Sequence, residues 1–200
     1  ELPTLGKLSN LDSFALHAKV AELLERGLAQ KRGAQRAVLP QALALRLADD
    51  ALVGLPPELM TTAVLDEAPD RLQKSFLRRL GDLGQNAVAR GLAEALIRPG
   101  GRLVPANLTD REPWDRFAFL APLAPDQALE VLDAAVAGAD VHDEHFRYMV
   151  SDRLGKLLIA LAFDDSRFVR ATLAIAKLLA HSPSPARISA HHKDFLCLFQ

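Results

Sequence analysis

Apolar residues recur at helical spacing along most of the chain. Near the start, Asp12 and Ser13 are residue types that cap helices, and large apolar residues follow them at short intervals as far as Gly27. Prolines and glycines divide the later apolar stretches into segments of helix length. The pattern predicts a first helix that ends at Gly27 and further helices over residues 40–55, 58–65, 70–83, 86–97, 113–121, 125–137, 142–162, 165–181 and 186–200.

A different pattern lies between the first predicted helix and residue 40. Residues 28–33 and 34–39 form two short segments around a glycine, which predicts a small β-hairpin. A helix followed by a basic hairpin is typical of the closing part of a winged helix. We therefore expect residues 1–39 to be the C-terminal part of a winged-helix domain and residues 40–200 to be a helical-repeat domain.

The helical part shows signs of internal repetition. When the sequence is shifted by 40 residues, apolar positions coincide in one register: Leu77 with Phe117, Leu80 with Leu120, Leu83 with Leu123, Leu92 with Leu132 and Leu96 with Val136. A period near 40 is typical of two-helix repeats of the HEAT or armadillo kind, which bury their apolar faces by stacking. The alternative is that any leucine-rich helical pairs of similar length coincide this often. The expected architecture is all-α, an array of helical hairpins of the HEAT or TPR kind.

Composition supports a helical class. The chain holds 37 Leu and 33 Ala but only 20 β-branched residues, which favours helices over strands. The net charge is −1, and this value excludes a uniformly basic nucleic-acid binder and an acidic disordered tail. Half of the residues are hydrophobic, so most of the length is expected to fold.

The sequence contains no strong catalytic motif. The phosphate-binding pattern GxxxxGK[ST], the nucleophile elbow GxSxG and the zinc motif HExxH are all absent. We therefore expect no catalytic residue, no cofactor and no metal in this chain, and we expect that it is not an enzyme.

Two histidines and two neighbouring carboxylates are candidate sites. His142 and His145 lie three residues apart, but a structural zinc site needs four ligands, so solvated histidines are the simpler interpretation. Asp164 and Asp165 are neighbours at a predicted helix start, where capping is the simpler role. Trp114 and the segment 117–119 form an aromatic patch, for which core packing is favoured over a ligand groove.

A basic cluster is the best candidate for a partner surface. It consists of Arg26, Lys31, Arg32 and Arg36, four positive charges within eleven residues at a helix end and hairpin. Wings often use such charges to contact phosphates. The nearby Glu22 and Glu25, and the lack of a basic recognition helix, count against nucleic-acid binding. The cluster leaves two alternatives open, a protein partner or a nucleic acid.

The cellular setting follows from a few features. The single cysteine, Cys197, excludes an internal disulfide and suits a reducing compartment. No apolar stretch reaches the ~20 residues needed to cross a bilayer, and the start has no signal-peptide pattern. We expect a cytoplasmic protein without membrane contact. Because the chain starts at Glu1 and ends on an apolar run, we also expect a piece of a longer protein.

Several segments resemble a known family. The matching segments are Leu28–Gly33, Arg36–Ala48, Pro69–Leu72, Ser75–Gly81 and Phe195–Phe199. They resemble large bacterial ATP-binding proteins of the STAND type, in which a basic wing precedes a motif like RAVLPHALANRLA. The sequence departs from that motif at Gln41, where histidine is expected, and at Leu45, where asparagine is expected.

The resemblance implies a place within a longer polypeptide. Such proteins carry an N-terminal effector and a P-loop ATPase module, followed by a winged helix and a helical-repeat sensor. They are similar to NACHT-like antiviral signalling ATPases, which oligomerise when the repeat region recognises a foreign protein. We therefore expect a non-catalytic protein-interaction or sensor module, whose partner is another protein or a neighbouring domain of the same polypeptide. The alternative is a DNA-binding transcriptional regulator that uses the basic cluster.

Overall fold

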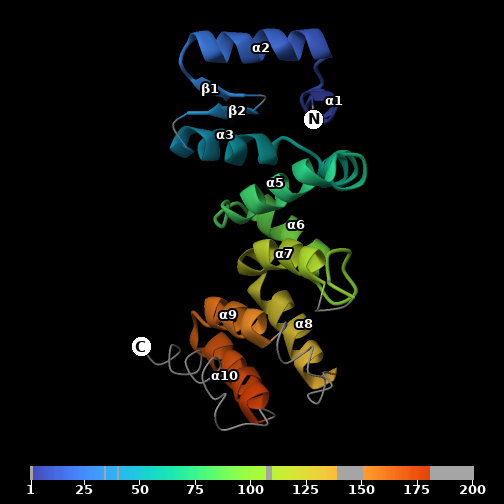
Figure 1. Ribbon diagram of the computed structural model, residues 1–200, viewed down its shortest axis with the longest axis vertical. Coiled ribbons are helices and arrows are strands. Elements are labelled where there is room, and N and C mark those ends of the chain that lie inside the picture. Colours follow the sequence, from blue (N-terminus) through green and yellow to red (C-terminus); the bar gives the residue numbers. More distant parts are fainter. Residues whose placement is uncertain (1, 34, 40, 107–109, 139–150, 181–200) are drawn as a thin grey trace. The chain divides into compact units, whose positions relative to one another are not determined.

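The computed structural model describes residues 2–33, 35–39, 41–106, 110–138 and 151–180 (Figure 1). This part of the chain is mostly helical, which confirms the all-α class, and its only strands form one two-stranded sheet. The chain divides into two compact units, Glu1–Ala89 and Arg90–Gln200. The expected boundary between residues 39 and 40 lies within the first unit, where α3 contacts β2. The HEAT or TPR type of the repeat stays a prediction.

The first unit begins with two helices, a hairpin and a third helix. Its elements are α1 (Leu2–Ser9), α2 (Ser13–Glu25), β1 (Ala29–Arg32), β2 (Gln35–Val38), α3 (Gln41–Val53), α4 (Pro57–Met60), the π-helix η1 (Thr61–Asp66) and α5 (Asp70–Gly81). The core of this unit lies around η1 and α5, where Met60, Val64, Leu77 and Leu80 are buried.

The predicted first helix is confirmed as α2. The carboxylate of Asp12 accepts a hydrogen bond from the backbone N–H of Ala15 at 2.7 Å, which caps the helix. Beyond the other end, Gly27 has a φ of 68°, a left-handed conformation that glycine adopts without strain. Capping and glycine chemistry therefore set both limits of this helix, as the sequence indicates.

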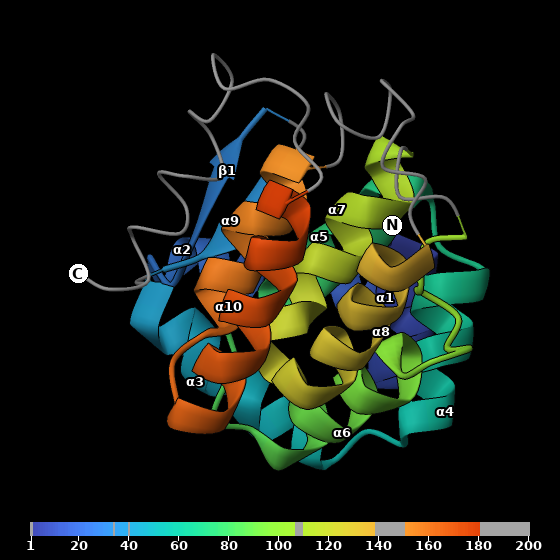
Figure 2. The same ribbon diagram turned by 90° about the horizontal axis from the view of Figure 1, so that it is seen from below.

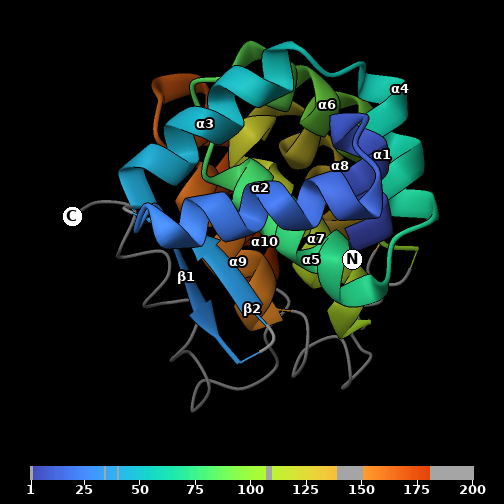
Figure 3. The ribbon, with the colours of Figure 1, turned by 90° about the horizontal axis from the view of Figure 1, so that it is seen from above.

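The predicted hairpin is confirmed as well. β1 and β2 pair antiparallel, with Ala29 opposite Val38 and Lys31 opposite Arg36. Gly33, at the turn, has a φ of 59°, which matches the preference of tight hairpin turns for glycine. Figure 3 shows the hairpin next to α2, and α2 contacts β1.

Helix α6 (Ala87–Ile97) follows α5 in the chain. A buried asparagine, Asn86, connects the start of α6 to α3. The side-chain amide of Asn86 donates to the backbone oxygen of Asp49 at 3.2 Å and to its carboxylate at 2.6 Å. Its side-chain oxygen accepts from the backbone N–H of Ala89 at 2.9 Å. One residue thus caps a helix and satisfies its own buried polar atoms, which is why a polar side chain is tolerated there.

The second unit is a set of packed helices. After α6 come α7 (Arg111–Leu120), the short 3-10 helix η2 (Ala121–Leu123), α8 (Pro125–Gly138), α9 (Ser151–Leu161) and α10 (Asp165–Ala180). Figure 2 shows α9 and α10 side by side, and α10 also contacts α8. The predicted helices over 86–97, 113–121 and 125–137 match these bounds closely. Residues 139–150 and 181–200, which include the first part of the helix predicted over 142–162 and all of the helix predicted over 186–200, lie outside the described residues.

Trp114 and Phe117 of the aromatic patch belong to the core, as predicted, and Phe119 is half-buried. Trp114 and Phe117 expose 4% and 0% of their surface, and their ring centroids lie 5.9 Å apart at an interplanar angle of 42°. Tilted rings at this separation attract each other through their quadrupoles. The patch therefore stabilises the second unit and is no ligand groove.

Candidate functional site

The basic cluster includes one arginine that already has an acidic partner. Nη2 of Arg26 lies 2.7 Å from Oε1 of Glu22, and Nζ of Lys19 lies 3.2 Å from the other oxygen of that carboxylate. The hydrogen bond from Lys19, followed by the charge of Arg26, lowers the pKa of Glu22. The charge of Arg26 is thus partly neutralised at the end of α2, although its side chain is 65% exposed.

The hairpin divides the other members of the cluster. The strand register places Lys31 directly opposite Arg36, and Arg32 opposite Gln35. Positions directly opposite share one face of an antiparallel ribbon, and successive positions alternate between faces. Positions 31 and 36 therefore belong to one face of the hairpin and position 32 to the other. Their role in binding stays a prediction.

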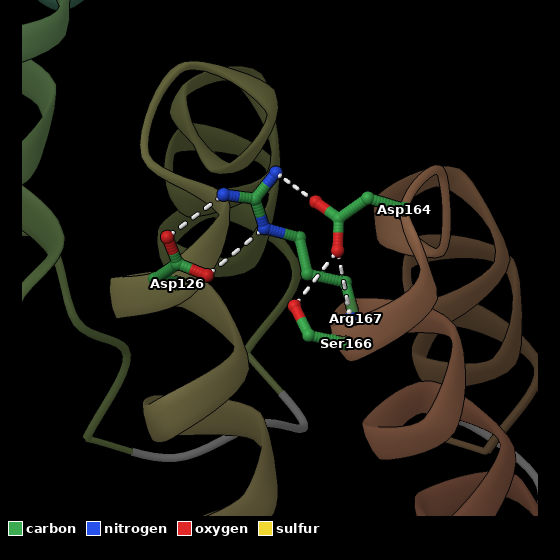
Figure 4. A network of polar contacts seen from close by, with 4 residues as sticks. All are labelled: Asp126, Asp164, Ser166 and Arg167. Atoms are coloured by element: carbon green, nitrogen blue, oxygen red, sulfur yellow. Dashed lines mark hydrogen bonds and ion pairs between the residues drawn. The ribbon is translucent and has the colours of Figure 1, made fainter.

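A second charged group, which the sequence did not reveal, links α8 to α10. Figure 4 shows the guanidinium of Arg167 between the carboxylates of Asp126 and Asp164. Nε and Nη2 of Arg167 donate to the two oxygens of Asp126 at 2.9 and 2.8 Å, and Nη1 lies 2.6 Å from Asp164. The carboxylate of Asp164 also accepts hydrogen bonds from Ser166 and from the backbone N–H of Arg167. That last bond confirms the predicted capping role of Asp164.

This group is largely screened from solvent on the arginine side. The side chain of Arg167 is only 20% exposed, and its guanidinium carbon lies 5.1 Å from the ring centroid of Phe163. The hydrogen bond from Arg167 lowers the pKa of Asp126, and the hydrogen bond from the backbone of Arg167 lowers the pKa of Asp164. The bond to Asp126 in turn raises the pKa of Arg167. All three groups therefore stay ionised across neutral pH, and the guanidinium of Arg167 attracts both carboxylates.

A second ion pair joins the same two helices. Nη2 and Nε of Arg170 donate to one oxygen of Asp133 at 2.7 and 3.2 Å. Asp126 and Asp133 lie seven residues apart on α8, and Arg167 and Arg170 lie three residues apart on α10, so each pair of residues shares one helix side. Two acids on one helix thus hold two arginines on the other. This arrangement ties α10 to α8, and an arginine neutralises each acid group.

Replacing Arg167 by lysine is expected to lower the free energy of unfolding of the second unit by about 1 kcal/mol. A lysine keeps the charge but loses the paired N–H donors that bind Asp126. Urea unfolding at pH 7 measures the loss. Arg111→Lys is the matched control, since the side chain of Arg111 is 82% exposed and its Nε lies 3.8 Å from Oδ2 of Asp115. Its effect on the free energy of unfolding is expected to be near zero.

The same variant gives a pH dependence with a defined sign. The pKa values of Asp126 and Asp164 are lowered from the ordinary carboxyl value of 3.8. Their contribution to the free energy of unfolding is therefore complete above that pH and is lost as the pH falls through the lowered values. The stability difference between wild type and Arg167→Lys is expected to shrink below about pH 4. A difference that grows in acid contradicts this assignment.

Several large apolar side chains of the first unit lie in solvent. Phe14 on α2 is 86% exposed and Val53 on α3 is 72% exposed. None of the thirteen residues of α2 is buried, although the helix carries apolar residues at core-facing spacing. A helix of this kind normally buries its apolar stripe. The apolar side chains of α2 are therefore covered only in part.

The described residues offer little that would hold a small ligand or metal. They contain no group of three or more histidine, cysteine, aspartate or glutamate residues able to bind a metal ion. An open depression of about 480 Å³ lies at the turn between α1 and α2, lined by Pro3, Gly6, Lys7, Asn10, Leu11, Asp12 and Ser13. His142 and His145, the candidate metal ligands, lie outside the described residues.

Among the described helices, none is both long and apolar enough to pass through a bilayer. Comparisons with models of known protein families, with curated protein sequences and with solved structures gave no match.

Proposed function

We propose that this chain is a non-catalytic protein-interaction module, and that it is part of a longer signalling ATPase of the STAND type. The observation that carries the first part is α2, a thirteen-residue helix with no buried residue and with Phe14 almost fully exposed. The likeness of residues 28–48 to a wing followed by the RAVLPHALANRLA motif supports the second part.

The apolar residues of α2 favour a protein partner over a small ligand. Leu16, Val20 and Leu23 are half-buried against their own unit, and Phe14 extends from the exposed side. The outer side of α2 thus presents a large apolar side chain, Phe14, and covering such a side chain contributes about 1.5–3 kcal/mol. Such a surface suits a second apolar protein surface, which is supplied by a neighbouring domain or by another protein.

Site-specific photocrosslinking tests the interaction. A benzophenone amino acid replaces Phe14 in the protein expressed in its source cells, and the adducts are identified by mass spectrometry. The expected result is one dominant adduct to a defined protein segment, of the same polypeptide or of another. The control carries the same group at Gln85, which is exposed in the loop between α5 and α6. Equal adduct patterns at both positions, or none at position 14, contradict the proposal.

The size of the native polypeptide tests the second part separately. An antibody raised against this chain is expected to detect a species far above 21.7 kDa in denatured extracts of the source cells. The same species is expected to bind ATP, which this chain alone is not expected to do. A species near 21.7 kDa overturns the STAND assignment and leaves the interaction module standing.

One observation favours the alternative, a DNA-binding regulator. Lys31 and Arg36 occupy opposed positions of the hairpin, and like charges placed directly opposite cost free energy unless an anion lies between them. Fluorescence anisotropy with duplex DNA at low salt decides between the two functions. Salt-dependent binding that is lost when Arg26, Lys31, Arg32 and Arg36 are all changed to alanine supports the regulator. Absence of binding at low salt removes it.

A further inference from the structure

The outer side of α10 carries a row of four exposed residues. They are Asp165, Val169, Leu173 and Lys177, each four positions after the last. Val169 and Leu173 are 55% and 57% exposed, which is unusual for two neighbouring large apolar side chains. The buried residues of α10 lie on the opposite side of the helix, toward α8 and α9. The row therefore points away from the core of the second unit.

Two copies of this row match each other when they lie antiparallel. The row reads acidic, apolar, apolar, basic from the N-terminal end. Consider a second α10 that lies antiparallel to the first, with the twofold axis passing beside Ala171, the midpoint of the row. Asp165 of each copy then lies beside Lys177 of the other. Val169 of each copy then meets Leu173 of the other. A twofold contact requires a surface that matches itself in this way.

Helix geometry allows the two rows to meet along their whole length. Residues at intervals of four form a ridge inclined to the helix axis, and two such ridges pack together at a crossing angle of about −50°, the commonest class in globular proteins. The row from Asp165 to Lys177 is one such ridge. Packing it against its own copy brings both charged ends and both apolar pairs into contact at one common crossing angle.

We propose that a second copy of this chain docks on the exposed row of α10 and forms an antiparallel twofold dimer. The contact covers one face of one helix, less than the ~1,200 Å² of a standard stable interface, so the dimer is weak and reversible. Lys177 also takes part in an interaction within its own chain. Its ammonium group has three donors and serves both partners. This surface belongs to the second unit and α2 to the first, so the dimer and the proposed function are tested by different variants.

Sedimentation equilibrium of the full chain tests the dimer directly. Between about 10 μM and 1 mM, the apparent mass is expected to rise from 21.7 kDa toward twice that value. Leu173→Glu places a charge at the apolar centre of the proposed contact and is expected to weaken association at least tenfold. Because Leu173 is exposed in the single chain, the substitution is expected to leave the fold intact. Glu130→Lys, an exposed charge reversal on α8, is the control and is expected to leave association unchanged.

Charge reversal at the two ends tests the register. Asp165→Lys alone and Lys177→Asp alone each place like charges together and are expected to remain monomeric. Mixed in equal amounts, the two variants recover complementary ends and are expected to form a heterodimer, and the double variant is expected to dimerise again. Circular dichroism verifies that each variant keeps its helices, and Leu173→Glu provides the test if an end variant does not fold.

Three outcomes overturn the proposal. The first is a wild-type chain that stays monomeric at 1 mM, since the row is then not a self-docking surface, whatever else covers it. The second is dimerisation that Leu173→Glu leaves unchanged, because a different surface then pairs. The third is folded charge variants that do not associate when mixed, because the antiparallel register is then wrong.

Discussion

Replacing Phe117 by alanine is expected to lower the free energy of unfolding by about 3–5 kcal/mol, the usual loss when a fully buried phenylalanine is truncated. Phe117 is completely buried in α7, and its ring packs against that of Trp114. The truncation removes apolar contacts and leaves a cavity that the surrounding helices fill only in part. The melting temperature is expected to fall by at least about 10 °C.

Trp114 provides a local measurement of this loss. It is the only tryptophan in the chain and lies next to Phe117, so its fluorescence during urea unfolding reports on the second unit. Phe163→Ala is the matched control, since Phe163 is 62% exposed and the guanidinium of Arg167 lies over its ring. Its expected cost is below about 1 kcal/mol. If Phe117→Ala costs no more than the control, Phe117 does not pack in the core.

Local signals in the sequence predict much of the fold. Three such signals act on residues only a few positions away: the cap at Asp12, the glycine at position 27 and the glycine at the hairpin turn. The structure confirms the helix limits and the hairpin that they predict. The bounds of α7 and α8 follow from prolines and apolar spacing in the same way. Such features need no knowledge of the rest of the chain, which is why a sequence pattern identifies them.

The sequence does not predict helix α1, which contacts the distant η1. Helix α1 contains Pro3 and Gly6, both poor helix formers, so local propensity argues against it. A side chain at Gly6 would meet the backbone oxygen of Leu11 at 2.7 Å, so the glycine is needed where the chain turns back. Asn10 completes that turn with a φ of 52°. The turn after α1 therefore requires Gly6, the same glycine whose low helix propensity argues against the helix.

The segment predicted as one helix over 58–65 also differs in detail. The structure divides it into α4 and the π-helix η1, whose wider turn is marked by the bond from the N–H of Glu67 to the oxygen of Thr62. Three consecutive residues of η1, Ala63, Val64 and Leu65, are buried. Apolar spacing alone does not distinguish a wider turn from a regular one, so the sequence indicates only that a helix lies there.

The charged groups show the same division between local and distant information. The capping role of Asp164 follows from its place before a helix, and the structure confirms it. The pairing of Arg167 with Asp126 spans 41 residues, and no local pattern singles out these two residues among the many charges of the chain. The basic cluster appears compact in sequence, but the alternation of the hairpin separates position 32 from positions 31 and 36.

Gly101→Ala is expected to destabilise the second unit by about 1–3 kcal/mol, because the added methyl group has no room in the tight turn after α6. A methyl group at this position would lie 2.5 Å from the backbone oxygen of Leu96 and 2.7 Å from that of Arg98. Neither oxygen is free to move away, because Leu103 donates to the first at 2.9 Å and Gly101 itself donates to the second at 2.6 Å. The substitution must therefore open the turn that ends α6.

Gly91→Ala in the same helix separates this steric effect from a general effect of adding a methyl group. Nothing lies within 4 Å of a side chain at position 91, and its backbone is helical. Alanine there restricts the unfolded chain and favours the helix, so the variant is expected to gain about 0.5–1 kcal/mol. Urea unfolding followed by Trp114 fluorescence measures both variants. Opposite signs support a closed turn at Gly101, whereas a gain at both positions shows that the chain beyond α6 adapts to the added methyl group.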